Sequence, residues 1–242
     1  MHFSTERRLD DVIEREFTIA GIPGFLWTPA SPPSAVPLIL LGHPGNLPRV
    51  YPRILARAQA AAARGFAAAA IEIPGAGDRP SPPGVAEARA SLQQSLASGE
   101  RPSEEVIDRL VLPLVDQAVP EWQATLDELL ELPGIGGPVG FSGGIISIGV
   151  RLASVEPRIV AAGLFAGSFV PRAIIEEARR VTIPIHVLLQ WDDEGNDRQQ
   201  ALELFDAFAS EEKGLNANLG GHTGVPKHAA HDADEFFARH LR

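Results

Sequence analysis

Residues 138–148 read PVGFSGGIISI, and they carry the most specific indication of the fold in this chain. It contains Gly140-Phe141-Ser142-Gly143-Gly144, a G-x-S-x-G pattern between a very short strand (138–141) and a helix expected over residues 143–154. Small residues permit a sharp turn there, and such a turn pushes the serine hydroxyl outward. It also leaves the Gly143 N–H at a helix N-terminus, where a developing negative charge is stabilised. Ser142 is therefore a candidate nucleophile, with Gly143 as an oxyanion donor.

Short apolar runs alternate with amphipathic stretches on both sides of this motif. The predicted strands are residues 37–43, 66–75, 159–165, 183–191 and 215–219, and the predicted helices are residues 51–64, 172–181, 197–210 and 227–241. This alternation predicts one α/β domain over residues 1–242, a doubly wound and mostly parallel sheet with helices on its faces. Residues 16–27 alternate apolar and polar side chains, which predicts an antiparallel hairpin before the parallel strands.

A segment rich in proline, serine and glycine interrupts the alternation at residues 79–102. A helical pattern resumes at Ser103, which resembles an N-cap followed by an acidic first turn. We interpret residues 79–113 as a small helical insertion or lid. Pro120 is expected to break the helical region that follows into two pieces.

A serine hydroxyl is a weak nucleophile until a neighbouring base takes its proton, so a histidine should follow Ser142 in the chain. His222 lies in the glycine-rich segment 220–224, between the last predicted strand and the last predicted helix. An imidazole on such a loop can reach the turn that carries the serine. The other histidines downstream lie in a strand, on a helix or at the terminus, so His222 is the candidate base.

The acid that orients this histidine should follow the predicted strand 183–191. The chain reads Gln190-Trp191-Asp192-Asp193-Glu194 there, so three carboxylates compete for the role. The two that do not take it would form a solvated acidic turn before the helix that begins near Asp197.

A second oxyanion donor should come from the loop after the predicted strand 37–43, which reads Gly42-His43-Pro44-Gly45-Asn46. Proline has no N–H, so the backbone N–H of Gly45 or of Asn46 is the partner for Gly143. His43 precedes the serine in the chain and has no obvious metal-ligand partners. We expect it to brace the loop through a hydrogen bond.

Composition excludes several classes of protein. The formal net charge of −10 argues against binding to nucleic acids or anionic membranes, because that affinity comes from Lys and Arg. The absence of cysteine excludes disulfides, thiolate metal sites and a cysteine nucleophile. The first residues are polar and charged, and the Ala-rich segment 58–70 is too short to span a bilayer. We expect a cytoplasmic protein without nucleic-acid or membrane partners; the oligomeric state is left open.

The motifs LLGHPG, IPGAGDRP, GFSGG, LLQWDDE and GGHTGVP occur in the order found in the α/β-hydrolase superfamily. The chain resembles this superfamily and, within it, the dienelactone-hydrolase-like esterases. The resemblance favours Asp193 as the acid, three residues after Gln190, with Asp192 as the alternative. It also implies an ion pair between Asp78 and Arg79 that braces their loop, with a substrate contact as the alternative role.

The chain departs from these relatives in two places. Many carry His-Gly-Gly-Gly where this chain has His43-Pro44-Gly45-Asn46, and dienelactone hydrolases proper use cysteine where this chain has Ser142. Their substrate is therefore not carried over.

Ser142, His222 and Asp193 together predict a serine esterase with a catalytic triad and an acyl-enzyme intermediate. The substrate would be a small-molecule ester or related acyl compound, and the scheme needs no metal or organic cofactor. Alternatives that use the same triad are a thioesterase, an acyltransferase or a cofactor-free haloperoxidase. A non-catalytic binding protein with the same fold is the alternative from another class.

Overall fold

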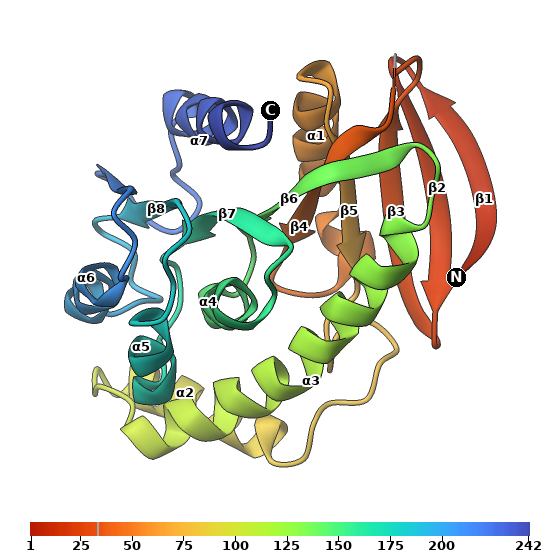
Figure 1. The fold of residues 1–242 in the computed structure, drawn as a ribbon. Helices are drawn as coiled ribbons and strands as arrows, with labels where there is room; N and C mark the ends of the chain where they lie inside the picture. The colour runs from red at the N-terminus through yellow and green to blue at the C-terminus, as the bar shows by residue number, and fades with distance from the viewer. Residues whose placement is uncertain (33) are drawn as a thin grey trace.

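The computed structural model describes residues 1–32 and 34–242, which form one sheet covered by helices on both faces (Figure 1). The strands in the described residues are β1 (His2–Leu9), β2 (Val12–Ile19), β3 (Ile22–Pro29), β4 (Val36–Gly42), β5 (Ala67–Ile71), β6 (Ile135–Gly143), β7 (Ile159–Phe165), β8 (Ile185–Gln190) and β9 (Lys213–Asn218). The helices are α1 (Leu47–Ala63), α2 (Val85–Ala97), α3 (Glu104–Leu130), α4 (Ile146–Val155), α5 (Arg172–Ala178), α6 (Arg198–Ala207) and α7 (Lys227–His240).

The strands lie in the order β1-β2-β3-β5-β4-β6-β7-β8-β9. From β5 to β9 all neighbours are parallel, whereas β1, β2 and β3 form an antiparallel edge that joins the sheet through β3 and β5. The predicted hairpin is confirmed as β2 and β3. The sequence pattern does not predict β1, because this edge strand is largely exposed and has no buried face to impose an alternating pattern.

Each face of the sheet has its own apolar core. Ile39 and Leu41 pack with α1 and α7, and their neighbours Leu38 and Leu40 pack with the helices of the opposite face. Successive side chains of a strand point to opposite faces, so one continuous aliphatic run supplies both cores. Figure 1 shows α1 and α7 on one side of the sheet, with α3, α4, α5 and α6 on the other. The predicted doubly wound, mostly parallel α/β fold is confirmed.

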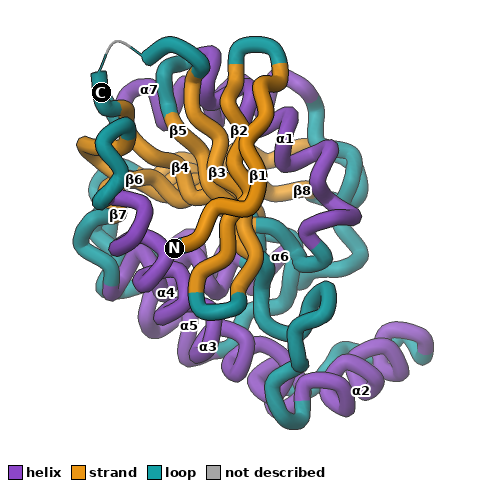
Figure 2. Tube along the Cα trace, turned by 90° about the vertical axis from the view of Figure 1, so that its right-hand side faces the viewer, coloured by secondary structure: helices purple, strands orange, loops and turns teal. Residues whose placement is uncertain are grey.

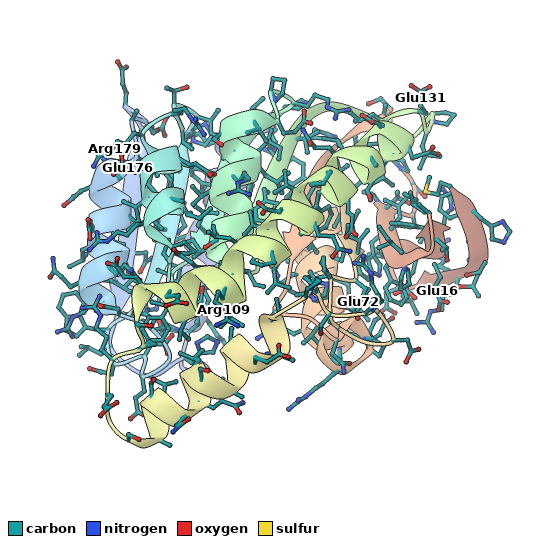
Figure 3. The ribbon with its side chains drawn as sticks, turned by 90° about the horizontal axis from the view of Figure 1, so that it is seen from below. Glu16, Glu72, Arg109, Glu131, Glu176 and Arg179 are labelled. Carbon is teal, nitrogen blue, oxygen red and sulfur yellow. The ribbon has the colours of Figure 1, made fainter. Side chains whose placement is uncertain are left out.

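The region between β5 and β6 forms two helices that pack on each other, α2 and α3. Figure 2 shows α2 at the periphery of the molecule, and Figure 3 shows α3 crossing the face of the sheet. Ser103 is the N-cap of α3, since its side chain accepts a hydrogen bond from Val106 N (3.3 Å). No helix of the described residues combines the length and apolar character needed to cross a membrane.

The expectation that Pro120 divides this region is wrong. α3 continues for 27 residues through Pro113 and Pro120. Each proline removes one backbone donor, but ten residues along the helix are buried, and burying that face outweighs the lost hydrogen bonds. Tertiary packing therefore overrides the local preference of proline.

Candidate active site

His222 and Asp193 meet at the edge of the sheet where the parallel strands end. Asp193 follows β8, and its Oδ2 lies 2.8 Å from Nδ1 of His222. A carboxylate only accepts hydrogen bonds, so Nδ1 is the donor and Nε2 is the ring atom left to accept a proton. The Asp193 side chain is 1% exposed and the His222 side chain is 50% exposed. The pair thus joins a buried, fixed acid to an imidazole that solvent and ligands can reach.

Hydrogen bonds around this pair separate the roles of the two neighbouring acids. Oδ1 of Asp193 accepts from Gly195 N (2.8 Å), so both of its oxygens are engaged. Asp192 instead accepts from Gly220 N (3.0 Å) and holds the base of the histidine loop. Gln190, at the end of β8, donates to Gly221 O (3.1 Å) in the same loop. Asp193 is therefore the acid in contact with His222, and Asp192 supports the loop.

Ser142 lies in β6, paired with Leu41 of β4 and Gly163 of β7. Its Oγ accepts a hydrogen bond from Nη2 of Arg57 at 3.0 Å. Within the described part of the chain, no hydrogen bond joins Ser142 to His222. The structure thus brings the predicted base and acid together, while the predicted nucleophile contacts an arginine that no sequence motif marks.

Arg57 comes from α1 and binds the ends of two neighbouring strands. It donates to Gly42 O of β4 (2.9 Å) and to Ser142 O of β6 (2.6 Å), in addition to the Ser142 hydroxyl. Burial, with a smaller contribution from the nearby charge of Arg53, lowers the pKa of Arg57 to about 10. No sequence signal marks Arg57, because 85 residues separate it from Ser142.

The turn after Ser142 is made by two glycines in the left-handed region, Gly143 (φ 76°) and Gly144 (φ 77°). The helix expected from residue 143 therefore begins later, at Ile146, since left-handed residues cannot continue into a right-handed helix. A Cβ on Gly144 would lie 2.8 Å from Cα of Gly42. This close approach of two backbones requires glycine at the turn.

The loop after β4 is braced by His43, as predicted. Nε2 of His43 donates to Ile71 O (2.8 Å), and its Nδ1 accepts from Gly45 N (3.1 Å). This arrangement requires the neutral ring, and burial lowers the pKa of His43. The Gly45 N–H, one of the two predicted oxyanion donors from this loop, is thus already engaged. Asn46, the other, has φ 55° and caps α1 by accepting from Arg49 N (3.1 Å).

The expected ion pair between Asp78 and Arg79 is wrong. Arg79 instead forms a two-pronged pair with Glu121 of α3 and donates to Glu72 O (2.6 Å). A guanidinium group binds best to a carboxylate that faces both of its N–H donors. The carboxylate in that position is Glu121, which lies 42 residues further along the chain. Arg79 still braces its loop, as the resemblance implied, but by tying it to α3.

A hollow of about 930 Å³ lies beside His222. Its lining combines the loop after β4, the first turns of α1, the loop after β5 and one residue of α2. Ser142 is not part of this lining, which agrees with its hydroxyl facing Arg57. Phe165, at the end of β7, packs edge-on against the His222 ring, with the two ring centroids 5.2 Å apart, and supports it from the side.

Comparisons with known proteins find similarity in structure. No family model and no curated protein matches the chain. A cold-adapted esterase from an Arctic intertidal metagenomic library, solved as a PEG-bound complex, is 28% identical over the full length of both chains, with a TM-score of 0.80. A Klebsiella pneumoniae protein assigned as a dienelactone hydrolase is 15% identical over 95% of this chain and 99% of its own, with a TM-score of 0.68. An acetyl xylan esterase from Paenibacillus is 16% identical over 99% of this chain and 88% of its own, with a TM-score of 0.66.

The sheet order and these similarities show that the chain has the α/β-hydrolase fold. Within that fold, the 28% identical neighbour is an esterase, which confirms the predicted resemblance to esterases of the α/β-hydrolase superfamily. The neighbour assigned as a dienelactone hydrolase shares the fold.

Proposed function

We propose that this protein hydrolyses carboxylic esters and that His222, held by Asp193, is the base that activates the nucleophile. The observation that carries the proposal is the 2.8 Å contact between His222 Nδ1 and the buried Asp193. A buried carboxylate on Nδ1 fixes the tautomer that accepts a proton at Nε2, and it stabilises the imidazolium that results. The similarity to a cold-adapted esterase supports an ester as the substrate.

The nucleophile in this proposal is Ser142. Its Oγ forms a bond to the ester carbonyl carbon while its proton passes to Nε2 of His222. Collapse of the tetrahedral intermediate breaks the bond to the alcohol oxygen, which takes the proton from His222. Water then attacks the acyl-enzyme by the same exchange and releases the carboxylic acid. The carbonyl oxygen becomes negative in each tetrahedral intermediate and needs hydrogen-bond donors. We propose the Gly143 N–H and an N–H of the loop after β4 as these donors.

Attack requires the Ser142 hydroxyl to leave Arg57 and face the hollow. Rotation about χ1 moves Oγ between staggered positions, and the glycine pair after it gives the backbone freedom to turn. Of the two N–H groups in the loop, that of Gly45 would first have to release His43. We therefore propose the Asn46 N–H, which has no acceptor among the described residues, as the donor from this loop.

The test uses Ser142→Ala and His222→Ala, assayed with 4-nitrophenyl esters of increasing acyl length. The serine mechanism predicts that both variants fold as the wild type does and lose ester turnover. An organophosphonate should label the wild-type enzyme at Ser142, identified by peptide mass spectrometry, and should leave Ser142→Ala unlabelled. A folded Ser142→Ala variant that keeps wild-type turnover would exclude Ser142 as the nucleophile.

A second mechanism is favoured by one observation, the hydrogen bond that holds Ser142 Oγ on Arg57. In it, His222 removes a proton from water, and the hydroxide forms a bond to the ester carbonyl carbon without an acyl-enzyme. The bond to the alcohol oxygen then breaks, and that oxygen takes the proton from His222. This mechanism predicts that Ser142→Ala keeps turnover while His222→Ala loses it, with no phosphonate label at Ser142. Absence of turnover on every ester tested, in a folded wild-type protein, would overturn the esterase proposal itself.

A further inference from the structure

Three arginines face the hollow beside His222: Arg49 and Arg53 from α1 and Arg89 from α2. All three side chains are exposed. Within the described residues, none of them donates a hydrogen bond or forms an ion pair. The lining that they share contains no Asp and no Glu. The hollow thus has a cationic wall without protein counter-charges.

The positions of Arg49 and Arg53 on α1 are electrostatically unfavourable. Arg49 lies in the first turn, where the helix dipole disfavours cations, and this turn contains no acidic residue. Arg53 follows four residues later, so the two like charges lie on the same side of the helix and repel each other. Arg57 continues the row, and the charge of Arg53 lowers its pKa. A bound anion would relieve each of these repulsions.

The charges elsewhere in the chain make this cluster unusual. The protein has a net charge of −10, and arginines outside the hollow commonly pair with carboxylates. Examples are Arg79 with Glu121, Arg151 with Glu177 and Arg158 with Glu156. The nearby acid Glu72 contacts the start of α1, but it is only 2% exposed, and its oxygens already accept from Leu47 N and Ile73 N. An acidic protein therefore leaves three guanidinium groups unpaired at one hollow.

We propose that this hollow binds a dianionic group, such as a phosphate monoester, and that the esters hydrolysed at His222 carry such a group. The second half of this inference rests on the proposed esterase function. Guanidinium groups recognise phosphate and carboxylate oxygens through paired N–H donors, and three of them suit a group with at least two negative charges. Arg89 would contact the anion from α2, and Arg49 and Arg53 would contact it from α1.

Binding is tested first, without any need for turnover. Isothermal titration calorimetry with inorganic phosphate uses Ser142→Ala, so that catalysis plays no part, and compares it with the same protein carrying Arg49→Gln and Arg53→Gln. The expected result is a Kd about tenfold weaker in the protein without the two arginines, equivalent to ~1.4 kcal/mol. Arg180→Gln is the matched control, since the Arg180 side chain is exposed, lies outside the hollow and forms no hydrogen bond or ion pair with any residue that the structure describes. Its Kd for phosphate should stay unchanged.

Selectivity is then measured with three 4-nitrophenyl esters, whose acyl groups are butyryl (neutral), succinyl (one negative charge) and 3-phosphonopropionyl (two). The wild-type enzyme should have the lowest KM for the dianionic ester. Arg49→Gln with Arg53→Gln should reduce the preference for the dianionic over the neutral ester by about tenfold. Added salt should reduce the same preference, because screening weakens exposed charge pairs.

The two experiments separate failure of this inference from failure of the esterase proposal. Phosphate that does not bind, or that binds equally well without Arg49 and Arg53, overturns the anion site even when ester turnover is high. Arginine-dependent phosphate binding in a protein that turns over none of the three esters keeps the anion site and overturns the esterase. Turnover that prefers the neutral ester would show that the arginines do not select the substrate.

Discussion

Replacing Asp193 by Asn is the sharpest perturbation of the proposed mechanism, because it changes one charge and almost no volume. In the folded protein both carboxylate oxygens are used, one by His222 Nδ1 (2.8 Å) and one by Gly195 N (2.8 Å). An amide has only one oxygen. Either its NH2 group faces His222, which forces the proton onto Nε2, or it faces Gly195 N and breaks that bond. The side chain at position 193 is too buried for water to repair either loss.

The first arrangement removes the proton acceptor, because Nε2 then carries hydrogen. The second keeps the tautomer but removes the negative charge that stabilises the imidazolium. General base catalysis by a positioned side chain contributes about 10²- to 10⁴-fold, and loss of the orienting carboxylate in a Ser-His-Asp site costs about 10⁴-fold. We therefore expect kcat to fall by about 10²- to 10⁴-fold, roughly 3 to 5 kcal/mol of activation free energy. KM should change little, because Asp193 is buried behind His222.

The assay is steady-state hydrolysis of a 4-nitrophenyl ester, with circular dichroism and thermal unfolding to establish that the variant folds. Asp192→Asn is the matched control. Its side-chain oxygen can still accept from Gly220 N, so kcat should stay within about threefold of wild type. If Asp192→Asn lowers kcat as far as Asp193→Asn does, or if Asp193→Asn is fully active, the assignment of the acid is wrong.

Three further predictions concern the scaffold of the site. Glu14→Ala should destabilise the fold by about 3 to 5 kcal/mol in urea unfolding, because the buried Trp27 indole N–H and the half-buried Tyr51 hydroxyl both lose the acceptor to which they donate. Glu6→Ala, which removes the exposed pair between Glu6 and Arg15, should cost under about 1 kcal/mol, and equal losses would contradict this. Gly144→Ala should lower the free energy of unfolding by about 2 to 4 kcal/mol, because the new Cβ would clash with Gly42 and the residue has a left-handed φ. In the same urea unfolding measurement, Gly134→Ala should be nearly neutral, since its Cβ would meet open space, and equal effects would contradict this. Burial lowers the pKa of His43 in the folded protein, so neutral His43 contributes its full stability above the unfolded-state pKa of about 6.5, and this contribution is lost as the pH falls. Between about pH 7 and pH 5, Tm should therefore drop more in the wild type than in His43→Gln. Parallel curves of Tm against pH would refute this prediction.

Local patterns predicted most of the sheet and helices, because burial on one face or both leaves a periodic trace in the sequence. The strand at residues 159–165 has the predicted bounds, and the apolar run of β4 is within one residue of its prediction at each end. Prediction failed where the local signal and the packing disagree. β1 lacks a buried face, and α3 passes through Pro120 because its length packs against the sheet.

The candidate site divides in the same way. His222 and the acidic turn at Asp192 and Asp193 stand out in the sequence, because loops at the ends of strands carry polar residues next to glycine. The choice between the two acids needed the resemblance to known esterases. The structure then places Asp193 on His222 and Asp192 on the backbone of the loop.

Local patterns of residue types were enough to predict the α/β architecture and the candidate serine, histidine and acids, and the order of the motifs carried the resemblance to esterases. Three features became visible only in the folded molecule: Arg57 holds the Ser142 hydroxyl, Arg79 pairs with Glu121, and unpaired arginines of α1 and α2 share one hollow. The physical reason is distance along the chain. An ion pair or hydrogen bond between residues 42 or 85 positions apart depends on how helices pack against the sheet, and no local pattern of residue types records that packing.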